Sequence, residues 1–332
     1  AELPNLWKGA ELTLGAEAQD DNVRGGQHFV SLRLRIPLGG KERRSTLTAQ
    51  ERRMTAPVVR DVDIVTGNRT VTTATPGTTE TATETSGGSA ITVLDSATTT
   101  GANLPTAVVT AGANSTVILS GTFNTTAKTT VQSGQTIMGS GTLAVRSPSG
   151  RTATLTLSSG ATVSATIAGT GSVTSNPGFL MANNSTLTGL TISLSRSGGV
   201  GAYGVYANGI SGATISNNTI TGTETGAATG VGVSLTNATN ITVSNNTITG
   251  TTGAGVAAIA LGLSISGTAT VTGNTLNASG GSTNNHHTFI NSAIAITINS
   301  GSTGNVKGSG TICRSEGAVT GSVSYTDGST CP

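Results

Sequence analysis

The sequence has few of the large side chains that fill a globular core. Of its 332 residues, only 2% are aromatic and 8 are proline, whereas 47 are glycine. A thick core needs large side chains packed at high density, so this composition predicts a thin and repetitive core. Val, Ile and Leu recur at regular positions after residue 100. That regularity argues against low-complexity disorder, which does not maintain apolar positions.

Acidic residues are scarce over most of the chain. Of the 15 Asp and Glu residues, 12 precede Ala97, and only Glu224, Glu316 and Asp327 follow it. Calcium cages and two-carboxylate glycosidic cleavage both need clustered acids. The sequence therefore predicts that the chain is not an enzyme, with no catalytic residue, cofactor or metal. The alternative is a polysaccharide lyase or hydrolase, and lyase chemistry would use an Arg or Lys base, through Arg146, Arg151 or Arg196.

The charge balance and the cysteines exclude other classes. A net charge of +2, with no aromatic residues among the basic ones, does not indicate a nucleic-acid partner. The two cysteines, Cys313 and Cys331, are predicted to form a disulfide worth ~3 kcal/mol, which suits an oxidising compartment. Two free thiols are the alternative.

No run of about 20 apolar residues indicates a transmembrane helix, and no signal peptide precedes Ala1, so we expect the chain to be a mature form or a fragment.

The N-terminal part of the sequence alternates between apolar and polar positions in two runs, 10–18 and 30–38. This pattern predicts an antiparallel hairpin that is either a soluble hairpin or a pair of β-barrel strands with a charged, water-facing side. Thr48 and Glu51 have the spacing of a capping box, which predicts a short helix ending before Pro57. The segment 66–88 is rich in Thr and lacks an apolar period, so an extended linker is expected there.

The stretch from the second run through Glu51-Arg52-Arg53-Met54 to 57–63 resembles the end of the barrel in inverse autotransporters, the intimin-like outer-membrane proteins. The resemblance implies a barrel end followed by a passenger outside a bacterial cell. The earlier barrel strands of that family are missing here. The hairpin is therefore a remnant, or it pairs with strands of other chains, and it is the only part expected to meet a membrane.

The rest of the chain repeats with a period of about 28 residues, which lies in the range of solenoid repeats. One column of equivalent positions is formed by Asn218, Asn246 and Asn274. Two apolar columns are formed by Leu187, Ile215, Val243 and Val271, and by Ile192, Ile220, Ile248 and Leu276. Two further columns are formed by Tyr203, Val231 and Ile259, and by Val205, Val233 and Leu261. Short strands separated by Asn-containing turns at such a period predict a solenoid with one continuous apolar column. Asn suits these turns because it tolerates left-handed backbone geometry.

The Ser-Asn-Asn-Thr-Ile-Thr-Gly repeats resemble those of right-handed parallel β-helices of the pectin-lyase type, and the segment 130–137 resembles the early coils of similar surface proteins. The resemblance implies an all-β solenoid over about 90–310. The expected organisation is a hairpin (1–40), a helix and linker (41–88), a parallel β-helix (89–312) and a disulfide-closed cap (313–332). This fold serves many functions, so the resemblance does not name one.

Two features are candidate binding surfaces. Asn284, Asn285, His286 and His287 lie in a short insertion that interrupts the repeat, which predicts a projecting loop that either binds a ligand or is simply polar. Regular outward Thr and Ser positions also flank the second apolar column. They either bind a glycan or an ice plane, or reflect the strand preference of β-branched residues. The positions are Thr191, Thr219, Thr247 and Thr275 on one side, and Ser193, Thr221 and Thr249 on the other.

These observations together predict a non-catalytic β-helix protein at a bacterial cell surface or outside the cell, with a structural or adhesive role. Its expected partners are further copies of itself, in a fibre or surface layer, and glycans or a host surface. Self-pairing would use strand edges of the hairpin and of the solenoid ends. An ice-binding protein that uses the Thr arrays is a further alternative.

Overall fold

The structure is a computed structural model that describes residues 2–3, 11–21, 25–35, 71–75, 78–158, 160–168, 176–198, 201–253, 257–280, 284–291, 296–310 and 312–332. The chain divides into two units, residues 1–65 and 66–332. Within the described residues, no helix is long and apolar enough to cross a membrane.

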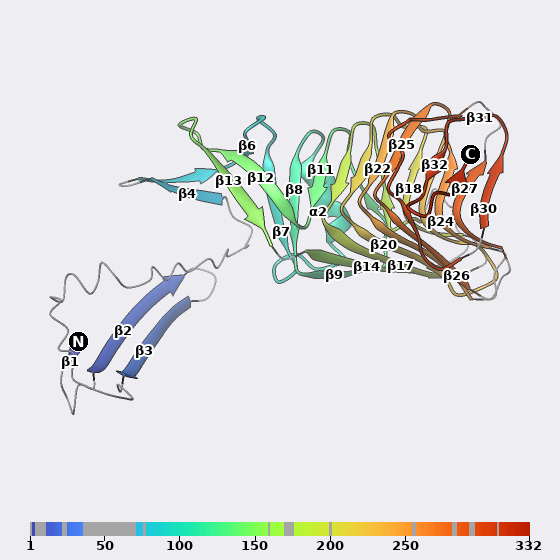
Figure 1. Ribbon diagram of the computed structural model, residues 1–332. Helices are drawn as coiled ribbons and strands as arrows, with labels where there is room; N and C mark the ends of the chain where they lie inside the picture. The colour runs from blue at the N-terminus through green and yellow to red at the C-terminus, as the bar shows by residue number, and fades with distance from the viewer. Residues whose placement is uncertain are drawn as a thin grey trace, which may run out of the picture. The chain divides into compact units, whose positions relative to one another are not determined.

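The second unit is a parallel β-helix, in which each coil contributes one strand to each of three sheets (Figure 1). The first sheet contains β7 (Ile91–Asp95), β8 (Thr116–Ser120), β11 (Thr136–Met138), β16 (Thr186–Thr188), β19 (Thr214–Ser216), β22 (Ile241–Ser244), β25 (Thr268–Thr272), β28 (Ile296–Ile298) and β31 (Val319–Thr320). The second contains β9 (Thr122–Thr125), β14 (Ala161–Ala168), β17 (Leu190–Ser197), β20 (Thr219–Glu224), β23 (Thr247–Thr252), β26 (Thr275–Gly280) and β29 (Val306–Lys307). The third contains β10 (Thr129–Thr130), β15 (Phe179–Leu180), β18 (Ala202–Asn208), β21 (Gly230–Thr236), β24 (Ala258–Ser264), β27 (Asn285–Asn291) and β30 (Ile312–Glu316). The predicted fold class is confirmed.

The predicted apolar columns follow the strand register. In the first sheet, Leu187 pairs with Ile215, Ile215 with Val243, and Val243 with Val271. All four side chains are fully buried in one continuous core. The second column, from Ile192 to Leu276, is paired and buried in the same way in the second sheet. Stacked Val, Ile and Leu side chains thus replace the missing aromatic residues, because each coil packs on its neighbours.

A ladder of buried Asn side chains occupies the turn between the first and second sheets. The Nδ2 of Asn246 donates to the carbonyl of Ile215 (2.8 Å) and to the Oδ1 of Asn274 (2.9 Å), while its own Oδ1 accepts from the backbone N–H of Asn218 (2.9 Å). The same pattern continues to Asn305. Each side chain therefore satisfies buried backbone groups of the neighbouring coils.

Both ends of the β-helix core are covered. Helix α2 (Leu104–Ala111) buries Leu104 and Val108 against the first coils, and buried Gln135 donates to the carbonyl of Val108 (2.9 Å). At the other end, the C-terminal segment forms β32 (Val323–Ser324) and β33 (Thr330–Cys331). A disulfide joins Cys313 to Cys331 there.

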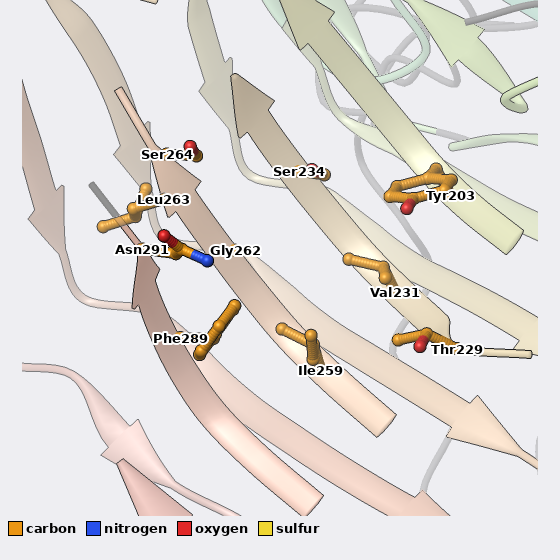
Figure 2. A pocket seen from close by; sticks show the side chains of 10 residues that line it. All are labelled: Tyr203, Thr229, Val231, Ser234, Ile259, Gly262, Leu263, Ser264, Phe289 and Asn291. Atoms are coloured by element: carbon orange, nitrogen blue, oxygen red, sulfur yellow. The ribbon is translucent and has the colours of Figure 1, made fainter. Parts of the chain in front are cut away.

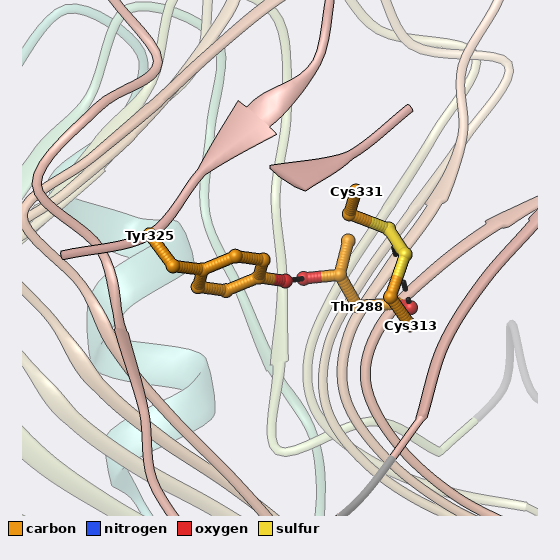
Figure 3. The surroundings of a disulfide bond; sticks show 4 residues. All are labelled: Thr288, Cys313, Tyr325 and Cys331. Carbon is orange, nitrogen blue, oxygen red and sulfur yellow. Dashed lines mark hydrogen bonds between the residues drawn. A yellow bond between two sulfur atoms is a disulfide. The ribbon is translucent and has the colours of Figure 1, made fainter. Parts of the chain in front are cut away.

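The C-terminal cap also holds a buried hydrogen bond. The hydroxyls of Tyr325 and Thr288 are 2.7 Å apart and point toward each other beside the disulfide (Figure 3). Thr288, on β27, stands where the preceding coil has Leu261, so this coil exchanges an apolar contact for a bond to the cap.

The N-terminal unit contains an antiparallel sheet of β1 (Glu2–Leu3), β2 (Glu11–Asp21) and β3 (Gly25–Arg35). The predicted hairpin corresponds to β2 and β3, in which Leu14 pairs with Leu32. The predicted short helix at 48–54 lies outside the described residues. In the Thr-rich segment the structure differs from an extended linker, because β4 (Val71–Thr75) and β5 (Thr78–Ala82) form a second hairpin. Thr favours strands when a partner strand is close.

We expect Asn246→Ala to lower the free energy of unfolding by about 3 kcal/mol, because it leaves several buried backbone groups unpaired at about 1–3 kcal/mol each. Chemical denaturation measures the change. Thr247→Ala, which removes an exposed side chain next to the ladder, is the control and should change little. Equal losses for the two variants would contradict the role of the ladder.

Candidate functional site

A shallow groove of about 220 Å³ lies on the outer face of the third sheet (Figure 2). It crosses four neighbouring strands, β18, β21, β24 and β27, so it runs along the stack of coils and not along one strand. The lining residues are Tyr203, Thr229, Val231, Ser234, Ile259, Gly262, Leu263, Ser264, Phe289 and Asn291.

The strand register places most of these residues on one face, whereas the side chain of Leu263 is buried in the core. Tyr203 pairs with Val231, and Val231 with Ile259, which gives the groove an apolar side. In a neighbouring column, Ser234 pairs with Gly262, and Gly262 with Phe289. The residues between these columns point inward and join the core. The groove is therefore a direct product of the parallel ladder.

Two aromatic rings stand at the ends of the groove, Tyr203 on β18 and Phe289 on β27 (Figure 2). Three strand spacings separate these strands, or ~14 Å. The ring of Tyr203 meets that of Tyr206 edge to face, with 5.4 Å between centroids. Phe289 stacks on His286 at 5.6 Å. Each ring is thus braced by a neighbouring aromatic side chain, which limits its rotation.

Gly262 opens the groove between the two rings. Its column carries Ser234 on one side and Phe289 on the other, so the missing side chain leaves the floor hollow. A Cβ built at Gly262 would meet Ile259 and Ser234 at 3.8 Å, which is ordinary van der Waals contact. The fold therefore tolerates a side chain here, and its absence determines the shape of the groove.

No lining residue carries a charge. Just past Phe289, the guanidinium of Arg314 lies 5.5 Å from the ring centroid, and Arg314 forms an ion pair with Glu316. Burial raises the pKa of Tyr203, so its phenol is a protonated hydrogen-bond donor at neutral pH. The groove thus offers ring faces, hydroxyls and one amide, and these groups fit a neutral polar ligand better than an ion.

The sequence indicated only part of this groove. Tyr203, Val231 and Ile259 were predicted to stack, as they do. Phe289 was missed because Leu261 pairs with Thr288, one position earlier than the period of the repeat requires. A shift of one position exchanges the two faces of a strand. The constant period therefore places Phe289 with Leu261 in the core, whereas its ring lines the groove.

The predicted binding loop is not a loop. Asn285, His286 and His287 lie within β27, and only Asn284 lies outside a strand. Both imidazole rings are buried. Asn285 pairs with Ala258 and His286 with Ile259, so this segment continues the third sheet and does not project from it.

The three arginines considered as a catalytic base are not brought together. Arg146 ends β12 (Gly141–Arg146) and pairs with Glu84 at 2.9 Å, while Arg151 precedes β13 (Thr152–Leu157). Arg196 is buried in β17, where Nη1 donates to the carbonyl of Gly201 (3.2 Å). Glu224, the next residue in the register, is also buried and accepts from the N–H of Gly226 (2.9 Å).

The predicted Thr and Ser columns lie on the outer face of the second sheet. Their register is unbroken from β14 to β26. The first column also includes Thr122 and Thr162, and the second includes Asn124, Ser164 and Asn277. A third column adds further hydroxyls from Thr166, Ser195, Thr223, Thr251 and Ser279.

Comparisons with known proteins give one fold match. No family model matches the chain, and no curated protein matches it. A solved structure, the crystal structure of an alginate lyase from Paenibacillus sp. str. FPU-7, matches over 69% of this chain and 99% of that chain, with 13% sequence identity and a TM-score of 0.28. A likeness at this level identifies no functional residue.

This match corrects the prediction that the chain is not an enzyme. The matched structure is a lyase, so a prediction that rested on the scarcity of acidic residues in the coils is withdrawn.

Burial of His287 leads to a prediction about pH. Burial lowers the pKa of His287 below its ordinary value of 6.5, and the positive charge of Lys307 acts in the same direction. Below about pH 6.5 the unfolded chain therefore binds a proton that the folded chain does not, so stability falls as the pH falls. We expect the melting temperature to drop between pH 7 and pH 5.

The His287→Gln variant isolates this effect, because it should show a smaller drop over the same range. Asp327 and Glu80 also have lowered pKa values, but their contribution to stability begins to be lost only below about pH 4 to 5, where carboxylates of the unfolded chain take up protons. A drop of the same size in the variant would rule out His287 as the cause.

Proposed function

We propose that the chain is an extracellular adhesive β-helix that binds carbohydrate in the groove on its third sheet. The observation that carries the proposal is the pair of braced rings, Tyr203 and Phe289, at the two ends of an uncharged groove. Aromatic faces cover the apolar C–H face of a sugar ring, while nearby hydroxyl and amide groups bond its hydroxyls.

The polar lining supports a sugar more than an apolar ligand. Ser234, Ser264 and Thr229 offer hydroxyls that both donate and accept, and Asn291 adds an amide. The apolar patch of Val231 and Ile259 is narrow and lies between these groups. Alternating apolar and polar contacts of this kind match the two chemical characters of a pyranose.

A location outside the cell is proposed from two independent features. The disulfide between Cys313 and Cys331 suits an oxidising compartment. The resemblance of the N-terminal segment to the end of an inverse autotransporter barrel suggests display on a bacterial surface. Binding through a lateral face suits an adhesive role, because α2 and the C-terminal cap cover both ends of the stack.

The outer face of the second sheet favours ice binding as a second candidate. Its columns present Thr, Ser and Asn at constant strand spacing and no charged side chain from β9 to β26. A rigid array of methyl and hydroxyl groups could match a lattice of water molecules. Thermal hysteresis and faceted ice crystals would support this candidate, and their absence at millimolar protein would remove it.

The test of the proposed function is retardation of the full chain in gels that contain neutral or anionic polysaccharides. We expect at least one polysaccharide to retard the wild type. Tyr203→Ala and Phe289→Ala should each weaken binding about tenfold, which corresponds to ~1.4 kcal/mol. Thr249→Ala, on the second sheet, is the matched control and should bind like the wild type.

Reducing ends and unsaturated products measured in the same samples show whether the bound polymer is also cleaved. Cleavage would add a lyase or hydrolase activity to the binding site. Retardation that survives both groove variants would place binding elsewhere and contradict the proposal.

A further inference from the structure

The strand β13 lies outside the solenoid and has one free edge. It follows β12 in an antiparallel hairpin, and the sheet order is β13-β12-β6, where β6 is Glu84–Thr85. Its pairing with β12 is continuous from Gly141 opposite Leu157 to Arg146 opposite Thr152. Among the described strands, none pairs with the other side of β13.

This edge carries none of the devices that usually protect an exposed strand. Its sequence, Thr-Ala-Thr-Leu-Thr-Leu, contains no charge and no proline, and its pairing with β12 contains no bulge. Thr152, Thr154 and Thr156 are exposed, whereas Ala153 and Leu155 on the other face are half-buried. An uncharged, regular edge with free N–H and C=O groups is a template for another strand.

The hairpin is anchored, so this edge has a fixed geometry. Leu143 and Leu157 pack on an apolar cluster of Val93, Ile118 and Met138, which lies on the outer side of the first sheet. On the far side of β12, Arg146 pairs with Glu84 at 2.9 Å. A preorganised strand loses little conformational entropy when it pairs.

We propose that β13 pairs antiparallel with β13 of a second copy of this chain. A two-fold axis at Leu155 places Leu155 opposite its copy, Ala153 opposite Leu157, and Thr154 opposite Thr156. Opposed residues share a face in an antiparallel pair. This register therefore keeps the apolar side chains on one face and the threonines on the other.

Charge also permits this pairing. Arg151, which precedes β13, is the nearest charged residue in the chain. With the axis at Leu155, the two copies of Arg151 lie ~27 Å apart along the strands. That distance is several times the screening length of ~8 Å at physiological salt, so the repulsion is negligible.

The pairing differs from self-assembly through the ends of the solenoid, which α2 and the C-terminal cap cover. It joins two chains at one two-fold interface and so produces a closed dimer and not a fibre. The inference is independent of the proposed carbohydrate binding, because β13 contributes no residue to the groove.

The test is the mass of the full chain in solution by light scattering and sedimentation velocity, from about 1 to 100 µM. We expect a dimer for the wild type and a monomer for Thr154→Lys, which adds charge at the exposed edge. Thr221→Lys adds the same charge on the second sheet and should remain a dimer. Higher oligomers of the wild type would indicate an open assembly and contradict the closed dimer.

A cysteine variant tests the register directly. In a directly opposed antiparallel pair the Cα atoms lie about 4.5–5.5 Å apart, which a disulfide can span. Leu155→Cys should therefore form a covalent dimer under mild oxidation, whereas Thr221→Cys should stay single. A wild type that is monomeric at about 100 µM, a Thr154→Lys variant that stays dimeric, or equal cross-linking of both cysteine variants would overturn the proposal.

Discussion

The parallel ladder between neighbouring coils is the constraint on which the rest of the structure depends. Each coil places one strand in each sheet, and the register of β17, β20, β23 and β26 continues without a break. Any column of the sequence therefore becomes a column in space, whether it is the buried Ile ladder, the Asn ladder or the exposed threonines. The chain stacks small β-branched side chains where a globular domain would use many aromatic rings, although Phe123 and Phe179 are also buried in the core.

The sequence predicted what repeats at a constant step. The columns from Leu187 and from Ile192, and the Asn turns, follow from the constant period of the repeat, and so does the solenoid. The site was harder to predict, because it depends on a departure from the period. The shortened step to β27 turns Phe289 outward and pairs His286 with Ile259, whereas the repeat alone placed both histidines in a loop. Local composition carries no signal for such a slip, because register is settled by pairing with the neighbouring strand.

Charge is distributed in a way that suits lateral binding. The coils bury Arg196 and Glu224 in the interior and pair Arg314 with Glu316 beside the groove, so the groove itself stays neutral. Covered ends prevent the stack from growing, while an unprotected edge remains on β13. Two grooves held in one dimer would raise the effective affinity for a polymer without any new contact in either groove, because the second binding event becomes intramolecular.

The most direct test of the central claim, that the groove binds carbohydrate, is amide hydrogen exchange with and without the polysaccharide that retards the chain most. The account predicts slower exchange confined to β18, β21, β24 and β27, with no change in the second sheet. Protection of the Thr and Ser face alone, or of no strand in the third sheet, would contradict the assignment of the groove as the binding site.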